Sequence, residues 1–235
     1  MIKHGDWIQK MIETLELCNY TNLADCQCSW QSSHEVFQPI SYCLKKGNIY
    51  GFVSDYGCGG WGLVTCLGGR PTDGFGEGQV KLNGDIINPM DLKRYSAFIP
   101  ESVFDGINAS ADTITARECI QKALELSKLD TTVDRIKNDF RLTDGRFDRP
   151  ISFVSGEIWL ISMAVQFALN KEIFCFPWLN MRNIFRFEVC CELGIADKLR
   201  KAGKILLVPT SQLKIAKKHC DHVIVFEKSK ISYKK

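Results

Sequence analysis

A short apolar run that leads directly into a glycine-dense loop is the feature that most constrains the fold of this chain. Residues Ile49–Val53 have the length and composition of a buried strand. Residues 54–62, the Gly-rich loop, read Ser-Asp-Tyr-Gly-Cys-Gly-Gly-Trp-Gly, and the apolar residues 63–67 follow. A strand, a glycine-rich loop and a helix in this order form an architecture that holds phosphate. Backbone N–H groups and the positive end of the helix face the anion in such a loop.

Apolar runs alternate with helical patterns along the rest of the chain. Strands are predicted at 39–44, 79–84, 95–100, 173–176, 204–208 and 222–227, and helical periodicity is found at 1–17, 113–142, 158–169, 187–201 and 213–219. This alternation favours an α/β fold with a parallel sheet. Residues 18–38 are polar and read as irregular or edge-strand structure. Residues 100–150 are helical in pattern throughout and indicate an insertion.

Composition and charge narrow the class of protein. The chain has 235 residues, a net charge of +3, 24% charged and 45% apolar residues, which is typical of a folded globular protein. The near balance of charge argues against a nucleic-acid partner. The first residues lack the apolar core of a signal peptide, and no run of about 18 apolar residues exists. The sequence therefore predicts a cytoplasmic protein with reduced thiols.

The cysteines do not form a metal-binding pattern. The chain has 11 Cys but no C-x-x-C pair, and its close pairs are Cys26 with Cys28 and Cys190 with Cys191. Zinc sites usually repeat ligands two to four residues apart. Most of these cysteines lie inside apolar patterns, where Cys acts as a small buried hydrophobe. We therefore predict no metal site.

The Gly-rich loop lacks the side chains that act on a nucleotide. A working phosphate-binding loop reads G-x-x-x-x-G-K-[ST], in which Lys reaches the phosphates and the hydroxyl binds Mg²⁺. Here Gly60 stands at the Lys position, Trp61 at the hydroxyl position and Ser54 at the first Gly, and Asp55 adds a negative charge. Trp61 is predicted to fill the pocket as a core aromatic residue. The residues that remain for nucleotide contact are Gly57, Cys58, Gly59, Gly60, Trp61 and Gly62.

Several framework motifs carry a resemblance to a known family. Residues 45–53 read K-K-G-N-I-Y-G-F-V, residues 78–84 read G-Q-V-K-L-N-G, and residues 97–101 read A-F-I-P-E. In order and spacing these segments resemble the nucleotide-binding subunit of an ATP-binding cassette (ABC) transporter. The resemblance implies a P-loop NTPase-like (RecA-like) α/β fold. Its parts are a mainly parallel sheet, an antiparallel β subdomain and an inserted helical subdomain.

The resemblance also divides the chain into parts. Residues 1–36 form a divergent N-terminal segment, residues 37–99 with 151–235 form the ATPase-like core, and residues 100–150 form the helical subdomain. In this family an aromatic residue upstream of the first strand stacks on adenine. Tyr20 and Trp30 are the candidates here.

The catalytic motifs of the family can be located, and nearly all are eroded. The signature L-S-G-G-E falls on residues 153–157, where Gly156 and Glu157 are retained beside Ser155 and Val154 replaces the serine. Glu101 is the residue at the Q-loop position. Other residues occupy the places of the Mg²⁺-binding Asp, the catalytic Glu and the switch His, and these are Pro177, Trp178 and Ser211.

These losses predict that the chain alone does not hydrolyse ATP. Phosphoryl transfer depends on positioning and charge stabilisation, and losing one such group typically lowers the rate by about 10²–10³. The sequence thus favours a pseudo-ATPase that is a non-hydrolysing partner, scaffold or regulatory subunit of a membrane transport complex. The alternatives are an atypical ABC ATPase that powers transport in a composite dimer, or a non-transport binding or immunity module.

The resemblance implies partners as well. They are a membrane permease subunit, an intact ATPase paralogue, or both, in a homodimer or heterodimer at the inner face of the membrane. No cofactor is predicted, and binding of ATP and Mg²⁺ is restricted to a weak or composite site.

Overall fold

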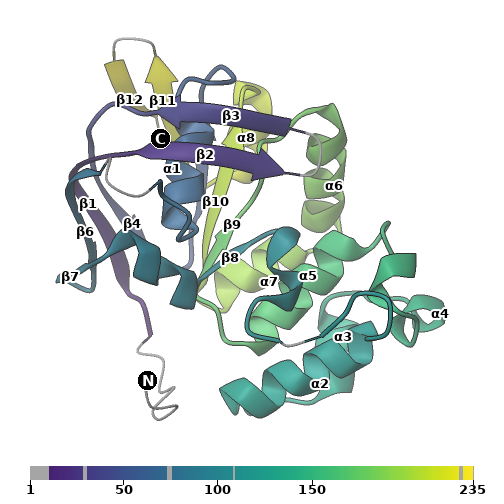
Figure 1. Cartoon of the computed structure of the whole chain (residues 1–235). Helices are drawn as coiled ribbons and strands as arrows, with labels where there is room; N and C mark the ends of the chain where they lie inside the picture. The colour runs from purple at the N-terminus through teal and green to yellow at the C-terminus, as the bar shows by residue number, and fades with distance from the viewer. Residues whose placement is uncertain (1–10, 29–30, 73–75, 108, 228–229, 235) are drawn as a thin grey trace.

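Six strands form the central sheet of the molecule, which is mainly parallel (Figure 1). The computed structural model describes residues 11–28, 31–72, 76–107, 109–227 and 230–234. The strand order is β12-β11-β5-β10-β9-β8, in which only β12 runs antiparallel to its neighbour. The bounds are β5 Ile49–Val53, β8 Ser96–Phe98, β9 Ile173–Cys175, β10 Ile205–Thr210, β11 His222–Glu227 and β12 Lys230–Lys234.

A separate antiparallel sheet has the order β4-β1-β6-β7. Its strands are β1 Thr14–Thr21, β4 Ile40–Lys45, β6 Glu77–Leu82 and β7 Asp85–Ile87. The helical periodicity assigned to residues 1–17 is wrong from Thr14 onward, and residues 1–10 lie outside the described part. Leu15 and Leu17 are buried on one face of β1, and Glu16 lies between them. This spacing of two residues matches a strand that pairs on both sides.

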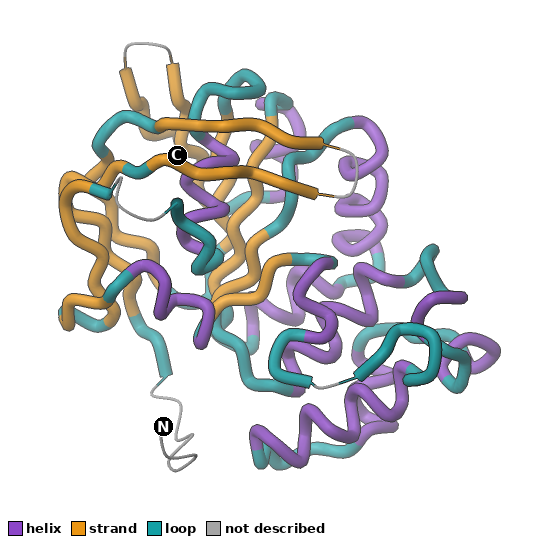
Figure 2. Tube along the Cα trace, in the orientation of Figure 1, coloured by secondary structure: helices purple, strands orange, loops and turns teal. Residues whose placement is uncertain are grey.

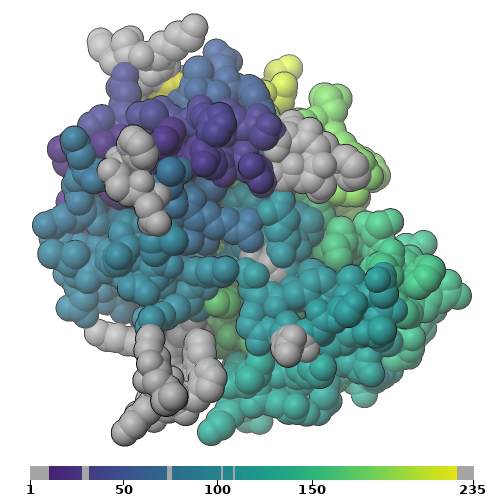
Figure 3. Space-filling view, in the orientation of Figure 1, coloured from purple at the N-terminus to yellow at the C-terminus, as the bar shows by residue number. Residues whose placement is uncertain are grey.

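A third sheet is the hairpin of β2 Leu23–Cys28 and β3 Gln31–Val36, called here the β2–β3 hairpin. It packs against α1 Gly60–Leu67 (Figures 1 and 2). In the space-filling view its side chains form a purple band across the upper part of the face shown (Figure 3). The segment 18–38, predicted to be irregular or edge-strand structure, therefore contains the end of β1 and the two strands of this hairpin, which covers the first helix.

The helices lie on both faces of the central sheet and in the lobe at the lower right of Figure 1. Their bounds are α2 Ala116–Ser127, α3 Val133–Asp139, α4 Asp144–Phe147, α5 Ile158–Ala168, α6 Met181–Glu192, α7 Ile195–Lys201 and α8 Leu213–His219. Short 3-10 helices span Pro89–Arg94, Glu101–Phe104 and Ile151–Phe153. Thr115 is followed three residues later by Glu118, a spacing that predicts a capping box, and the two residues form one at the start of α2.

Two helical expectations need correction. Residues 187–201 are not one helix, because Gly194 adopts a φ of 74° between α6 and α7 and ends the regular hydrogen bonding. Among the described residues of 100–115, the helical structure before α2 is the 3-10 turn Glu101–Phe104, so the segment 100–150 is not helical throughout.

Two apolar cores flank the central sheet. Alternate residues of β10 contribute to each, Leu206 to the core with α2, α5, α6 and α7, and Leu207 to the core with α1 and the antiparallel sheet. Within the described ranges, no helix combines the length and the apolarity needed to cross a bilayer.

Candidate functional site

The parallel strands bring the expected motif positions to one edge of the sheet. Ser54 N donates to Thr210 O at 3.1 Å, and Leu179 N donates to Pro209 O at 2.9 Å. The Gly-rich loop after β5, the segment after β9 and Ser211 after β10 therefore meet at the carboxyl ends of the strands. In open α/β sheets this edge is where ligands bind.

Backbone conformation explains why two positions of the loop are occupied by glycine. Gly57 and Gly59 have φ values of 81° and 99°, which favour glycine because it has no Cβ. Cys58 N donates to Asp55 O at 3.1 Å and closes a turn. Helix α1 starts at Gly60 without a side-chain cap. The loop thus directs the N–H groups of Gly57, Gly59 and Gly62 toward one point, as a phosphate-binding loop does.

That point is occupied by the carboxylate of Glu35 from β3. Gly57 N donates to Oε1 at 3.1 Å, while Gly59 N and Gly62 N donate to Oε2 at 3.1 and 2.8 Å. Glu35 has an exposed fraction of 0%. No sequence pattern marks Glu35 as a functional residue, because it lies 22 or more positions before its partners and belongs to no motif.

The positions of the Lys, the hydroxyl and the two carboxylates are packed and apolar. A Cβ on Gly60 would lie 2.7 Å from Ser54 Oγ, so this backbone is held close to the strand end. Trp61 is 0% exposed and is a core residue, as expected. Trp178 is 4% exposed, and Pro177 is buried beside it. The exposed ring of Tyr56 lies 6.0 Å from the ring of Trp61 and 5.8 Å from that of Trp178.

The other polar candidates at this edge differ in their partners. Glu101 Oε2 accepts from Arg70 Nη1 at 2.7 Å, and the Arg70 guanidinium also lies 4.8 Å from the centre of the Phe98 ring. The carboxylate at the Q-loop position is thus held by a neighbouring cation. Ser211 is exposed at the end of β10.

The signature positions lie beside α4. Ser155 and Gly156 are exposed, whereas Val154 is buried. Glu157 Oε1 accepts from Thr143 Oγ1 at 2.8 Å and lies 3.5 Å from Arg146 Nη1. These contacts tie Glu157 to α4, so within this chain its carboxylate does not face the Gly-rich loop.

Tyr20 is not an adenine-stacking residue. Its exposed fraction is 2%, and its ring lies 5.7 Å from the Phe37 ring. Asn22 Nδ2 donates to its hydroxyl at 3.2 Å, and burial raises the pKa of that hydroxyl. The candidacy fails because the ring is enclosed in the core. Trp30, the other candidate, lies outside the described residues.

The cysteines that the structure describes lie mainly in apolar surroundings. Cys26, Cys66, Cys119, Cys175 and Cys190 are buried. Burial raises the pKa of the Cys66 and Cys119 thiols to about 12, so these groups stay protonated near neutral pH. Among the described residues, no three His, Cys, Asp or Glu side chains gather as they would around a metal ion.

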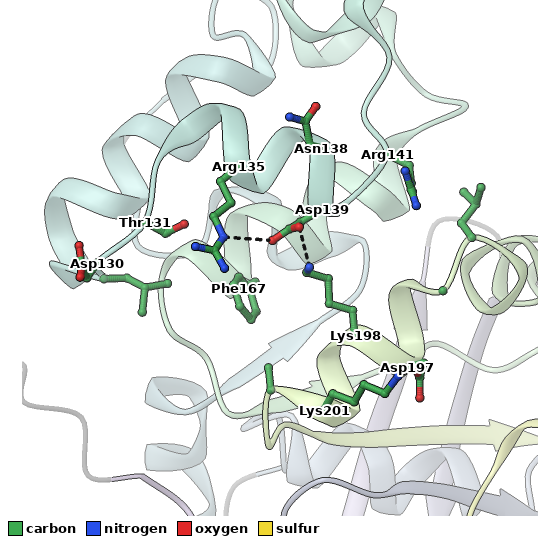
Figure 4. A pocket seen from close by; sticks show the side chains of 14 residues that line it. Asp130, Thr131, Arg135, Asn138, Asp139, Arg141, Phe167, Asp197, Lys198 and Lys201 are labelled. Carbon is green, nitrogen blue, oxygen red and sulfur yellow. Dashed lines mark ion pairs between the residues drawn. The ribbon is translucent and has the colours of Figure 1, made fainter.

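A charged cleft lies elsewhere, between α3 and α7 (Figure 4). It has a volume of about 810 Å³. Asp139 pairs there with Lys198 Nζ at 2.6 Å and with Arg135 Nε at 4.0 Å. Lys201 Nζ pairs with Asp197 at 2.7 Å. Positive and negative side chains pair with one another in the cleft, so the cleft has no strong electrostatic field of one sign.

Comparison with solved structures shows which fold this chain has. No family model matches the sequence. The ATP-binding subunit of an ABC transporter superposes with a TM-score of 0.61 and 17% identity, covering 93% of this chain and 89% of that one. The Clostridium perfringens protein cbiO1, part of the ABC transporter complex cbiONQ, gives a TM-score of 0.65 and 14% identity over 94% and 87%. The ATP-binding cassette MJ0796, a dimer bound to ADP and Pi, gives 0.62 and 16% over 93% and 98%.

These likenesses show a P-loop NTPase-like α/β fold of the kind found in ABC cassettes. A curated relative points the same way. It is a Treponema denticola protein that carries the name of an ABC transporter ATP-binding protein, and it is 25% identical over 221 residues and 89% of this chain. The chain spans 44% of the length of that relative. The chain therefore resembles the ATP-binding subunits of ABC transporters in sequence as well as in fold.

Proposed function

We propose that this chain is a catalytically degenerate ABC-type ATP-binding subunit, a pseudo-ATPase that acts as a non-hydrolysing partner, scaffold or regulatory subunit of a membrane transport complex. The observation that carries the proposal is the packing at the catalytic positions. Trp61, Pro177 and Trp178 are buried where a hydroxyl and two carboxylates would act. A buried apolar side chain cannot bind Mg²⁺ or orient water.

The residues present do not fit Mg-ATP at the Gly-rich loop. Three of the loop N–H groups are already bonded to Glu35. Phosphate needs those donors and a balancing cation, but Gly60 supplies no side chain. We therefore infer that the isolated chain binds Mg-ATP weakly or not at all. A composite site would use the exposed Ser155 and Gly156 against nucleotide held by an intact partner.

The partner part of the proposal rests on the neighbours. The Clostridium perfringens protein is part of a transporter complex, and MJ0796 is a dimer. By analogy we propose a homodimer or heterodimer that docks on a permease, at the cytoplasmic face of the membrane. Residues 100–150 are the proposed helical subdomain beside which the permease binds, and residues 37–99 with 151–235 are the core.

Calorimetry and an ATPase assay test the catalytic part. We expect the purified chain to show no Mg-ATP binding in the micromolar range and no phosphate release above the buffer rate. Glu101→Gln is the matched variant, because Glu101 is the carboxylate at the Q-loop position. Micromolar binding by the wild type, or hydrolysis that Glu101→Gln abolishes, would contradict the proposal.

Co-purification tests the partner part. We expect the tagged chain, expressed in its native cells, to retain a permease subunit or an intact ATPase paralogue through mild detergent extraction. Recovery of the chain with neither protein would favour a binding module that is unrelated to transport.

A further inference from the structure

We propose that the Gly-rich loop is an anion site whose ligand is the chain's own Glu35, a tethered carboxylate in the place of a nucleotide phosphate. The inference rests on the proposed function only in that the loop is not used for hydrolysis. It adds a named ligand and a reason why the loop remains folded without nucleotide. The β2–β3 hairpin then keeps the anion-binding position of the loop permanently occupied.

The compensation of charge supports this assignment. The Glu35 carboxylate is fully buried, and among the described residues no Lys, Arg or His forms an ion pair with it. A buried charge without partners is strongly unfavourable. The groups that bond to it are the N–H donors of Gly57, Gly59 and Gly62 at the start of α1. The positive end of the helix adds to their effect. The loop therefore holds the carboxylate with the same interactions that hold phosphate.

The close approach of β3 supports it independently. A Cβ on Gly62 would lie 2.8 Å from Glu35 Cβ, and a Cβ on Gly59 would lie 2.6 Å from the Cβ of Phe37, the residue after β3. Contacts this short leave no room for a side chain at those two positions unless the hairpin shifts. The glycines thus serve the docking of the hairpin, in addition to the conformation of the loop.

A further hydrogen bond joins the Gly-rich loop to the β2–β3 hairpin. Tyr56 Oη donates to Ser32 O at 2.6 Å, which joins the exposed tip of the loop to the hairpin. Figure 1 shows the hairpin lying across α1. Loop and hairpin are consequently connected by side chains from both partners.

Competition follows from the shared donors. A phosphate and the Glu35 carboxylate cannot accept from the same three N–H groups at once. A tethered group on a short flexible linker competes at an effective concentration of about millimolar, and a carboxylate already held in contact by a packed hairpin competes at a much higher one. Free phosphate at ~10 mM therefore does not displace Glu35 in the wild-type chain.

The experiment removes the tethered anion and offers a free one. The variants are Glu35→Ala and Glu35→Gln, and the control is Glu77→Ala, which changes an exposed glutamate of β6. Thermal unfolding is recorded with and without ~10 mM inorganic phosphate or sulfate, at constant ionic strength. We expect Tm of Glu35→Ala to rise by about 2–5 °C with either anion, because a ligand that binds the native state stabilises it. Wild type and Glu77→Ala should not respond, and Glu35→Gln should respond less than Glu35→Ala.

A measurement on the wild type keeps the inference testable if Glu35→Ala does not fold. The backbone amide resonances of Gly57, Gly59 and Gly62 should be unchanged by ~10 mM phosphate, because their N–H groups are occupied. Phosphate-dependent shifts of these resonances would overturn the inference. Folded Glu35 variants that ignore both anions would also overturn it and would leave Glu35 a purely structural residue. Neither outcome bears on ATP hydrolysis, so the proposed function is tested separately.

Discussion

Glu35 and Glu157 are two buried glutamates beside the first turns of two buried helices, and they are held in different ways. The carboxylate of Glu35 reaches α1 from a distant strand and is bonded by backbone N–H groups. Glu157 stands at the N-cap of its own helix, α5, and is bonded mainly by the side chains of Thr143 and Arg146, with a longer contact of 3.5 Å from Thr143 N. One site is built by backbone N–H groups, and the other mainly by side chains.

The difference shows which site can be changed by mutation one contact at a time. A backbone donor remains in place whatever residue carries it, so the α1 site depends on Glu35 and on the space that glycine leaves. At the α5 site most contacts come from side chains, and each of these side chains can be replaced separately. Substitutions at the two sites test this contrast.

Removing the two carboxylates should give unequal losses of stability. We expect Glu35→Ala to lower the free energy of unfolding by about 2–4 kcal/mol, because two buried N–H groups and one partly buried N–H group lose their acceptor together. Glu157→Ala should lower it by about 1–2 kcal/mol, since the side chains of Thr143 and Arg146 can turn to solvent. Urea denaturation measures both, with Glu77→Ala as the control. Equal losses for the two variants would remove the contrast.

Filling the space of a loop glycine should come next. In Gly62→Ala the new Cβ meets Glu35 Cβ at 2.8 Å and Glu35 O at 3.3 Å, so the hairpin must shift. We expect a loss of about 1–3 kcal/mol from this overpacking. The matched control is Gly145→Ala in α4, where no atom lies within 4 Å of the added Cβ. It should leave stability unchanged or raise it slightly. A Gly62→Ala chain as stable as this control would show that the hairpin does not press on the loop.

At the α5 site, Thr143→Val removes the hydroxyl that donates to Glu157 at 2.8 Å. We expect a loss of about 0.5–1.5 kcal/mol, the usual range for one hydrogen bond. Thr113→Val is the control, because its exposed hydroxyl contacts only the nearby Ser110 O at 3.3 Å. In thermal or urea unfolding the control should remain near the wild type. If Thr143→Val has the same free energy of unfolding as the wild type, contacts other than this hydrogen bond stabilise Glu157.

The smallest effect should come from Arg146→Ala. The Arg146 side chain is 52% exposed, and its Nη1 lies 3.5 Å from Glu157 Oε1. An exposed ion pair of this kind contributes about 0–1 kcal/mol and weakens in salt. Unfolding at low and at high salt should therefore show a difference from the wild type that shrinks as salt rises. A larger effect that does not depend on salt would mean that Arg146 acts by packing.

Much of the framework could be predicted from the sequence. Residues 213–219 and 222–227 form the predicted helix and strand with the predicted bounds. The capping box at Thr115 and the Asn83-Gly84 turn are also local signals, since each is set by residues a few positions apart. The predictions that were wrong concern segments where the local sequence pattern and the pairing of strands favour different structures. The apolar spacing at residues 14–17 is compatible with a helix or with a strand. Pairing with β4 and β6 makes this segment a strand.

The fold class, the Gly-rich loop and the loss of polar side chains can be read from the amino-acid sequence, the last at Gly60, Trp61, Pro177 and Trp178. These are properties of single positions and short spacings. The group that bonds to the loop and the enclosure of Tyr20 in the core depend on tertiary packing. A carboxylate finds backbone donors through the docking of a hairpin, and backbone N–H groups have no signature in the amino-acid sequence. The identity of the anion at α1 therefore becomes visible only when the chain is folded.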